Sequence, residues 1–230
     1  TEVLSVLGEY HGVPSIVKLQ THIQDRMAES LQDVRIANKD SMRKLKMKDD
    51  SHGKVRVVLE HFSTEMQDLL NRYNGGTLDL NGLNKEYHTI GTEGHNLAPY
   101  IPSLEAARIH PNISIHGGFI PRTYARLLMK EGKEKALQAA SKAGFISKYE
   151  TLEGTDQHYN FFESLLTGRN IYDSNGNDSA EEMSDRFREK MFPAQIIKDA
   201  SMAFCVKNLL SGKNKAKDKV LVVCGVGHML

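Results

Sequence analysis

The sequence has no tryptophan, only two cysteines and no clear excess of either charge. Cys205 and Cys224 are too few for a disulfide framework, so we interpret them as small core residues. No apolar run approaches the ~20 residues needed to cross a bilayer, so no transmembrane helix is expected. Thirty basic against 29 acidic residues leave a net charge of +1. That balance argues against general binding to nucleic acid or to a membrane surface.

The length and composition predict one α/β domain over residues 1–230. A chain of 230 residues with 40% hydrophobic residues is long enough for a substantial core. The chain begins at Thr1 and ends at Leu230 directly after a strand-like run. We expect a further strand or helix there, which would make this domain truncated at its C-terminal end. Residues 38–54 are rich in Lys, Asp and Ser, which predicts a solvated surface loop inserted before the second strand.

Short apolar runs predict strands, and the longer segments between them predict helices. The predicted strands cover residues 3–7, 55–59, 112–115 and 219–224. The second and the last are nearly continuous Val and Leu, which is typical of parallel strands buried on both faces. Apolar residues at helical spacing cover 16–31, 63–73, 100–108, 121–131, 179–191 and 193–211. This alternation predicts a three-layer α/β fold, with a mainly parallel sheet flanked by helices.

Glutamate and histidine residues cluster where the predicted strands end. Parallel sheets bind ligands outside the carboxyl ends of their strands. The residues at those ends are Glu9, Tyr10 and His11, then Glu60 and His61, then His116, and finally His228. Each one alone would serve equally well as a hydrogen-bonded structural residue or a helix cap. Together, Glu9, His11, Glu60 and His228 suit a divalent metal ion with an open water position, or metal-free acid–base chemistry.

Other polar residues are candidates for the border of this cleft. Gln195 and Asp199 interrupt an apolar stripe of the predicted 193–211 helix, so they either bond to loop backbone or face the cleft. Arg122 would either clamp a carboxylate or pair with a structural acid such as Asp199. His61 and His116 are assigned a supporting role, because neighbours at a strand end point to opposite faces. The remaining histidines are interpreted as surface residues: His22, His52, His88, His110 and His158.

Several motifs together resemble the ChaN-like haem-binding uptake family of the Tiki, TraB and erythromycin-esterase superfamily. They are GEYHG, LEHF with a following Gln, GFIPRTYARLLMKEG, FPAQIIKDASMA and VLVVCGVGHM, in the family's order over nearly the whole chain. The superfamily's Glu/His pair falls on Glu9 and His11, and its Gly-x-x-His on Gly225 to His228. The family's second-strand acid falls on Glu60. Its Pro-Arg and its Gln…Asp…Met helix fall on Pro121, Arg122, Gln195, Asp199 and Met202.

The resemblance implies a ChaN/Tiki-like fold that binds haem in the Glu/His cleft. Tyr10, His11 and His228 are then the candidate iron ligands, with Arg122 as a further cofactor contact. A haem shared by two copies of the chain would need one ligand from each. An apolar mouth for the haem would come from Phe62, Phe119, Tyr124 and Phe192.

Two other functions remain open from the resemblance. Tiki relatives are described as metal-dependent proteases and erythromycin esterases as hydrolases. This implies a metal-dependent hydrolase in which Glu9, His11, Glu60 and His228 hold Zn, Mn or Fe. The third possibility is a non-catalytic scaffold subunit of a larger complex. The 38–54 insertion and the lysine-rich 213–219 turn favour an organelle of a eukaryote, either mitochondrion or plastid. The chain also carries Gly94-His95 where bacterial relatives tend to have Trp.

Overall fold

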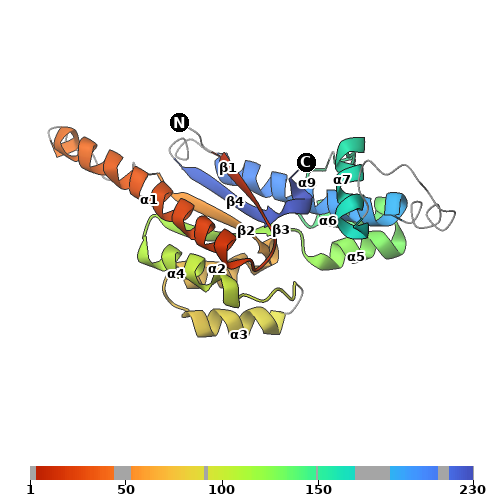
Figure 1. Ribbon diagram of the computed structural model, residues 1–230, viewed down its shortest axis with the longest axis horizontal. Coiled ribbons are helices and arrows are strands. Elements are labelled where there is room, and N and C mark those ends of the chain that lie inside the picture. Colours follow the sequence, from red (N-terminus) through yellow and green to blue (C-terminus); the bar gives the residue numbers. More distant parts are fainter. Residues whose placement is uncertain are drawn as a thin grey trace.

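Four parallel strands form the sheet, in the spatial order β1-β4-β2-β3. They are β1 (Leu4–Glu9), β4 (Lys219–Gly225), β2 (Val55–Ser63) and β3 (Ile113–Phe119). The two Val/Leu runs are the central strands, β4 and β2, which are buried on both faces. Helices cover the sheet on both sides (Figure 1). The predicted three-layer fold with a parallel sheet is therefore confirmed in this computed structural model.

The structure describes residues 4–43, 53–90, 93–148, 150–168, 187–211 and 218–229. Each of the four strands continues further toward its carboxyl end than its apolar run predicted. The extension of β2 carries it through Glu60 and His61 to Ser63. Polar residues are tolerated in this buried strand end because neighbouring elements supply their partners.

One face of the sheet is covered by α1 (Pro14–Arg43), α2 (Gln67–Asn74) and α4 (Ile101–Ile109), with α3 (Leu80–Ile90) packed outside α2. The helix α1 runs back along the sheet and projects past it (Figure 1). Short 3-10 turns precede α2 at Thr64–Met66 and α4 at Ala98–Tyr100. Alternate strand residues such as Val57 and Leu59 pack with Tyr73 and Leu104 in the core on this side. On the same face, Tyr100 at the end of the 3-10 turn before α4 contacts Glu9, the last residue of β1.

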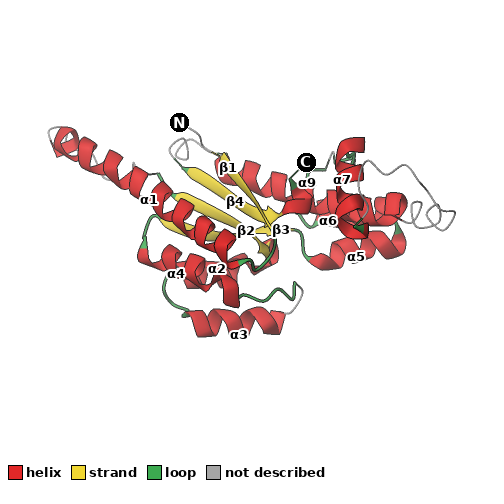
Figure 2. Cartoon of the chain, in the orientation of Figure 1, coloured by secondary structure: helices red, strands yellow, loops and turns green. Residues whose placement is uncertain are grey.

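The opposite face is covered by α9 (Phe192–Leu210), which follows a π-helical turn at Phe187–Met191. Residues such as Val58 and Val222 pack against Val206 of this helix. Three further helices lie beyond the carboxyl ends of the strands (Figure 2). They are α5 (Arg122–Glu131), α6 (Lys133–Lys142) and α7 (Asp156–Thr167). A 3-10 turn at Val226–His228 ends the described chain near α7.

Three outcomes differ from the sequence-based expectations. The helix α1 continues to Arg43, so residues 38–43 are helical rather than part of the predicted loop; residues 44–52 lie outside the described residues. Of the predicted helix 179–191, residues 179–186 are likewise outside them, and 187–191 form the π-helical turn. The helices α3, α6 and α7 were not predicted. None of the helices that the structure describes combines the length and the hydropathy needed to span a bilayer.

Candidate functional site

Glu60 and His61 direct their side chains to opposite faces of the sheet, because successive residues of a strand alternate. Glu60 contacts residues on the α9 side, namely His228 and Gly225. His61 contacts Glu9 and Tyr100 on the α1 side. The carboxyl edge of the sheet therefore carries two polar groups, one on each face.

The group on the α9 side is a buried run of ion pairs. Glu60 Oε1 lies 3.3 Å from His228 Nε2, and the amide of Gly225 donates to Glu60 Oε2. On its other side, His228 Nδ1 is hydrogen-bonded to Asp199 Oδ1. Gln195 Nε2 donates to the carbonyl of Gly227 at 3.2 Å and lies against the His228 ring. The two polar residues that interrupt the α9 stripe thus both contact His228.

The electrostatics of this group favour charged side chains. Burial alone would lower the pKa of His228, but its bonds to Asp199 and Glu60 outweigh burial and raise that pKa to about 9. Burial would raise the pKa of Glu60, whereas the bonds to His228 and to the Gly225 amide hold it well below its usual range. At neutral pH His228 is therefore an imidazolium held between two carboxylates.

The group on the α1 side is organised around the buried carboxylate of Glu9. Its Oε1 accepts a hydrogen bond from the Tyr100 hydroxyl at 2.7 Å and from His11 Nδ1 at 2.9 Å, and it lies 3.3 Å from His61 Nε2. Burial opposes ionisation, but the contacts with His11, His61 and Tyr100 lower the pKa of Glu9 to about 2. The Tyr100 hydroxyl also accepts from the amide of Gly12 at 2.9 Å, which anchors the turn after β1.

His11 connects the two groups. Its Nδ1 is bonded to Glu9, its Nε2 lies 3.6 Å from Glu60 Oε2, and its side chain is 41% exposed. The bond to Glu9 raises the pKa of His11. Carboxylates and imidazoles thus alternate through Glu9, His11, Glu60, His228 and Asp199, which we call the Glu–His chain. The four predicted metal or catalytic residues lie together, but their donor atoms are engaged with one another.

A separate set of imidazoles lies beside the Glu–His chain. One nitrogen from each of His11, His61 and His95 lies within 4.8 Å of the other two. His61 is buried, with 1% of the residue exposed; its Nε2 contacts Glu9, and its Nδ1 has no hydrogen-bond partner. Burial and the proximity of His61 lower the pKa of His95 to about 4, so this ring is neutral at physiological pH. We call these three residues the His trio.

His95 and Tyr100 were not among the predicted site residues. Both come from the segment between α3 and α4, and neither follows a strand. The only sequence signal was that Gly94-His95 stands where the resembling family tends to carry Trp. His158 was also misassigned: it is buried rather than on the surface, with Nε2 3.3 Å from the carbonyl of Gly227 and 3.8 Å from Asp199 Oδ2.

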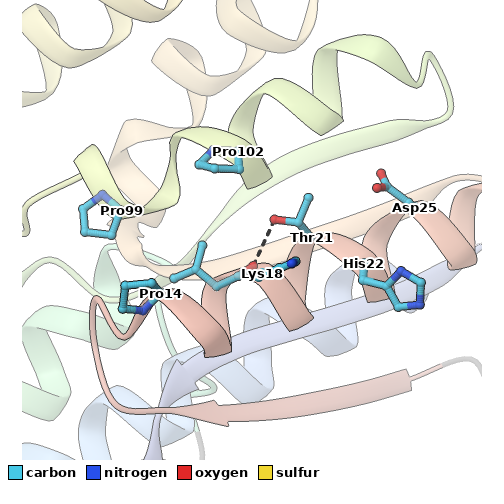
Figure 3. A pocket seen from close by; sticks show the side chains of 8 residues that line it. Pro14, Lys18, Thr21, His22, Asp25, Pro99 and Pro102 are labelled. Carbon is cyan, nitrogen blue, oxygen red and sulfur yellow. Dashed lines mark hydrogen bonds between the residues drawn. The ribbon is translucent and has the colours of Figure 1, made fainter.

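The surface beside this site is the turn from Tyr10 to Pro14. Tyr10 is 61% exposed and Val13 is 37% exposed. A groove opens next to this turn, between α1 and the segment that enters α4, and Figure 3 shows its side chains. Pro99 lies against the turn, since its Cγ is 3.5 Å from the position a Cβ would take at Gly12. The groove is lined by Pro14, Val17, Lys18, Thr21, His22, Asp25, Pro99 and Pro102.

Two predicted site residues lie outside the Glu–His chain. His116 bonds to Ser114 on the edge strand β3 and faces a different pocket, which includes Gln67 and Cys205. It is on β3, at the far edge of the sheet from β1, so it cannot support Glu9 or His11. Arg122 lies near Glu93 rather than Asp199: its amide donates to Glu93 Oε1 at 3.0 Å and its Nε is 4.0 Å from Oε2.

The aromatic residues expected at the mouth of the cleft are mostly core residues. Phe62, Phe119 and Phe192 are between 0% and 8% exposed, and Tyr124 is half-buried against Phe145. Phe119 still contacts the site, with its ring centroid 4.7 Å from that of His228. The exposed apolar surface of this region therefore belongs to the turn and the groove instead.

Comparisons with known proteins agree with this fold. The family model described as "Haem-binding uptake, Tiki superfamily, ChaN" matches residues 3–230. A solved structure described as "Cofacial heme binding to ChaN of Campylobacter jejuni" has 15% sequence identity and a TM-score of 0.59. The alignment covers 97% of this chain and 70% of that chain. At this identity the likeness concerns the fold alone. A search of curated proteins found no match.

Proposed function

The chain belongs to the ChaN family of haem-binding uptake proteins in the Tiki superfamily, and from this premise we propose that it binds haem at the exposed turn after β1. The neighbouring ChaN structure is of a protein that binds haem cofacially. The observation that carries the proposal is the exposed phenol of Tyr10 at the carboxyl edge of the sheet, beside the Glu–His chain. When bound, haem would supply an iron centre capable of redox chemistry or ligand exchange.

The three candidate iron ligands differ sharply in access. His228 is buried, with 4% of its side chain exposed, and both of its nitrogens face carboxylates. His11 is partly exposed but is bonded to Glu9 through Nδ1. Tyr10 extends into solvent, and phenolate is one of the axial ligands that haem proteins use. We therefore assign the iron ligand to Tyr10 and leave His228 in a structural role.

The groove beside the turn suits the rest of the macrocycle. Pro14, Pro99 and Pro102 provide rigid apolar walls beside the turn that carries Tyr10. Lys18 at the same groove would pair with a propionate carboxylate of haem (Figure 3). An apolar slot combined with one donor atom is the basic requirement of a haem site. The amide of Arg122 donates to Glu93, and its guanidinium lies next to Gly94 on the His95 side of the site, so we do not assign it to the haem contacts at Tyr10.

The Glu–His chain then serves to hold the haem-binding turn in place. Glu9 orients His11, and Tyr100 links Glu9 to the amide of Gly12. Gly12 adopts a φ of 73°, which favours glycine, so the turn is fixed in a conformation that a side chain would strain. A rigid turn reduces the entropy lost when the ligand binds. A cofacial arrangement would also bring two copies of this turn together, so we propose a homodimer in the haem-bound state.

A haemin titration followed by absorbance tests the proposal. We expect a saturable Soret shift with one haem per chain, and a loss of affinity of at least about tenfold in Tyr10→Phe because the iron ligand is gone. His11→Ala should weaken binding less. Tyr124→Phe is the matched control, since Tyr124 lies on α5 and packs edge-on against Phe145. Size-exclusion chromatography with and without haemin measures whether two chains associate.

Three results would redirect the assignment. If no Soret shift appears and the protein contains a stoichiometric metal, the metal-dependent hydrolase becomes the better hypothesis. If neither haem nor metal binds, the scaffold hypothesis is favoured. A Soret shift that is unchanged in Tyr10→Phe would leave haem binding in place but would refute Tyr10 as the ligand.

A further inference from the structure

We propose that the His trio is a binding site for one divalent transition-metal ion, distinct from the haem site at Tyr10. This metal set differs from the one that the strand ends predicted. It shares only His11 with that set, and adds His61 from β2 and His95 from the segment after α3. The proposal does not depend on haem binding, because the iron ligand is assigned to Tyr10.

The positions of the three imidazoles are close to what such an ion needs. Nitrogen ligands of a tetrahedral Zn²⁺ ion at about 2.0–2.1 Å lie about 3.4 Å from one another. In the described residues, one nitrogen from each ring already lies within 4.8 Å of the other two. His11 is 41% exposed and His95 is only partly buried, so small side-chain rotations would close the remaining distance.

His61 supplies an independent indication of a ligand. Only 1% of its side chain is exposed, yet Nδ1 has no hydrogen-bond partner, and Nε2 has only its 3.3 Å contact with Glu9 Oε1. A buried polar atom without a partner is costly, and native structures contain few of them. A metal ion bonded to one nitrogen would satisfy it. The main chain of His61 is well anchored, since its carbonyl accepts from the Tyr87 hydroxyl at 2.9 Å.

The same Tyr87 hydroxyl accepts from the amide of His95 at 3.1 Å. One phenol therefore holds the main chain of two members of the trio, on β2 and on the loop after α3. Because Tyr87 is itself buried, this link fixes the spacing of His61 and His95 before any ligand arrives. Such preorganisation is typical of built sites.

Glu9 has the position of an outer carboxylate that orients metal-binding histidines. Its Oε1 faces His11 Nδ1 at 2.9 Å and His61 Nε2 at 3.3 Å. A carboxylate on one nitrogen of an imidazole leaves the other nitrogen as the metal ligand. That assignment makes His11 Nε2 and His61 Nδ1 the donors. Glu60 Oε2 lies 3.6 Å from His11 Nε2 and is an oxygen donor within reach of the same space.

The donor set selects a class of metal. Imidazole nitrogens suit Zn²⁺, Cu²⁺, Fe²⁺ and Ni²⁺, whereas Mg²⁺ and Ca²⁺ prefer sites made of oxygen. Three histidines with an open fourth position resemble the ligand set of catalytic rather than structural zinc sites. The exposed edge of His11 is where that open position would meet solvent.

The test uses haem-free protein stripped with a chelator and titrated with Co²⁺, followed by its visible absorption, and with Zn²⁺ by calorimetry. We expect one ion per chain. His95→Ala should reduce affinity at least about 100-fold, because it removes a direct ligand, and Glu9→Gln should reduce it about 10- to 100-fold. His88→Ala, at an exposed position of α3, is the control and should bind as the unaltered protein does.

Two outcomes would overturn the site: no stoichiometric binding of either ion, or unchanged affinity in His95→Ala with circular dichroism showing a folded protein. His61→Ala lies in the core and risks unfolding, so His95→Ala decides the matter. Tyr10→Phe should keep full metal affinity while losing haem. This variant separates the two proposals, since failure of one leaves the other measurable.

Discussion

Glu60 and His228 form a buried ion pair, with Oε1 and Nε2 3.3 Å apart. The pair joins the end of the central strand β2 to the turn that follows β4. Its partners on either side, the amide of Gly225 and the carboxylate of Asp199, leave both charges compensated. We therefore expect this ion pair to stabilise the carboxyl ends of β2 and β4 and to keep His228 charged.

The first prediction concerns stability against pH. The folded-state pKa of His228, about 9, exceeds the ordinary value of 6.5. Its contribution is therefore fully present below about pH 6.5 and is lost as the pH rises through about 9. The shift corresponds to at most about 3 kcal/mol. Urea denaturation between pH 6.5 and pH 10 should show a steeper decline in the unaltered protein than in His228→Gln.

The comparison of the two proteins isolates this group. Lysines, tyrosines and other groups that titrate in the same range are present in both, so their effects cancel. Equal slopes of unfolding free energy against pH would contradict the raised pKa.

The second prediction concerns the central charge of the Glu–His chain. Glu60→Gln removes the carboxylate that faces both His11 and His228. His228 keeps its bond to Asp199 but loses one of its two carboxylates, so we expect a loss of about 1.5–3 kcal/mol at pH 7 and a lower pKa of His228. Urea denaturation measures the first effect and NMR titration of the histidine ring protons the second. Glu105→Gln, on the exposed side of α4, should change stability by less than about 0.5 kcal/mol.

Much of the fold could be predicted because its central strands are buried on both faces. The Val and Leu side chains of β2 and β4 must be buried on both faces of the sheet. The apolar faces of α1 and α9 cover them, one on each side. The helix α6 escaped prediction because its fully buried residues are Ala136 and Ala140, which give little hydrophobic contrast. A signal for α7 was present: Thr155 caps the helix by accepting from the amide of His158.

The site could be predicted only as far as strand ends define it. That principle selected Glu9, Glu60 and His228. The pairing of β1 and β2 with β4 places these residues near one another at the carboxyl ends of the strands. His95 and Tyr100 come from the segment between α3 and α4, whose position depends on tertiary packing rather than on a local pattern. The prediction for His116 was wrong for a different reason. His116 is near the carboxyl end of its strand, but that strand, β3, is the outer strand furthest from β1.

The third prediction concerns Tyr100, whose hydroxyl makes two buried bonds. It donates to Glu9 Oε1 and accepts from the amide of Gly12. Tyr100→Phe leaves both groups short of a partner, so we expect a loss of about 1–3 kcal/mol and a rise in the pKa of Glu9. Denaturation and amide hydrogen exchange at Gly12 measure these effects. Tyr124→Phe serves as the control, and exchange at Gly12 as slow as in the unaltered protein would refute the link.

The fourth prediction compares two glycines near the carboxyl ends of their strands, Gly117 on β3 and Gly225 on β4. A Cβ at Gly117 would lie 2.2 Å from the carbonyl oxygen of Ser63, in backbone that cannot move without disturbing the pairing of β2 with β3. A Cβ at Gly225 would lie 3.0 Å from His11 Nε2 and 3.2 Å from Glu60 Oε2. The first contact is with main chain and the second with side chains, one of which is partly exposed. The two substitutions should therefore fail in different ways.

Gly117→Ala should destabilise the protein by about 3 kcal/mol or more, because overpacking here forces a backbone shift. Gly225→Ala should cost about 1 kcal/mol, since His11 can turn away toward solvent. That movement breaks the contact of His11 with Glu60 and displaces it from the His trio, so Co²⁺ affinity should fall while the fold persists. The entropic benefit of replacing glycine is similar at both sites and does not affect the order. Urea denaturation and Co²⁺ titration of both variants test this, and a Gly225→Ala protein that loses more stability than Gly117→Ala would show that His11 is held rigidly.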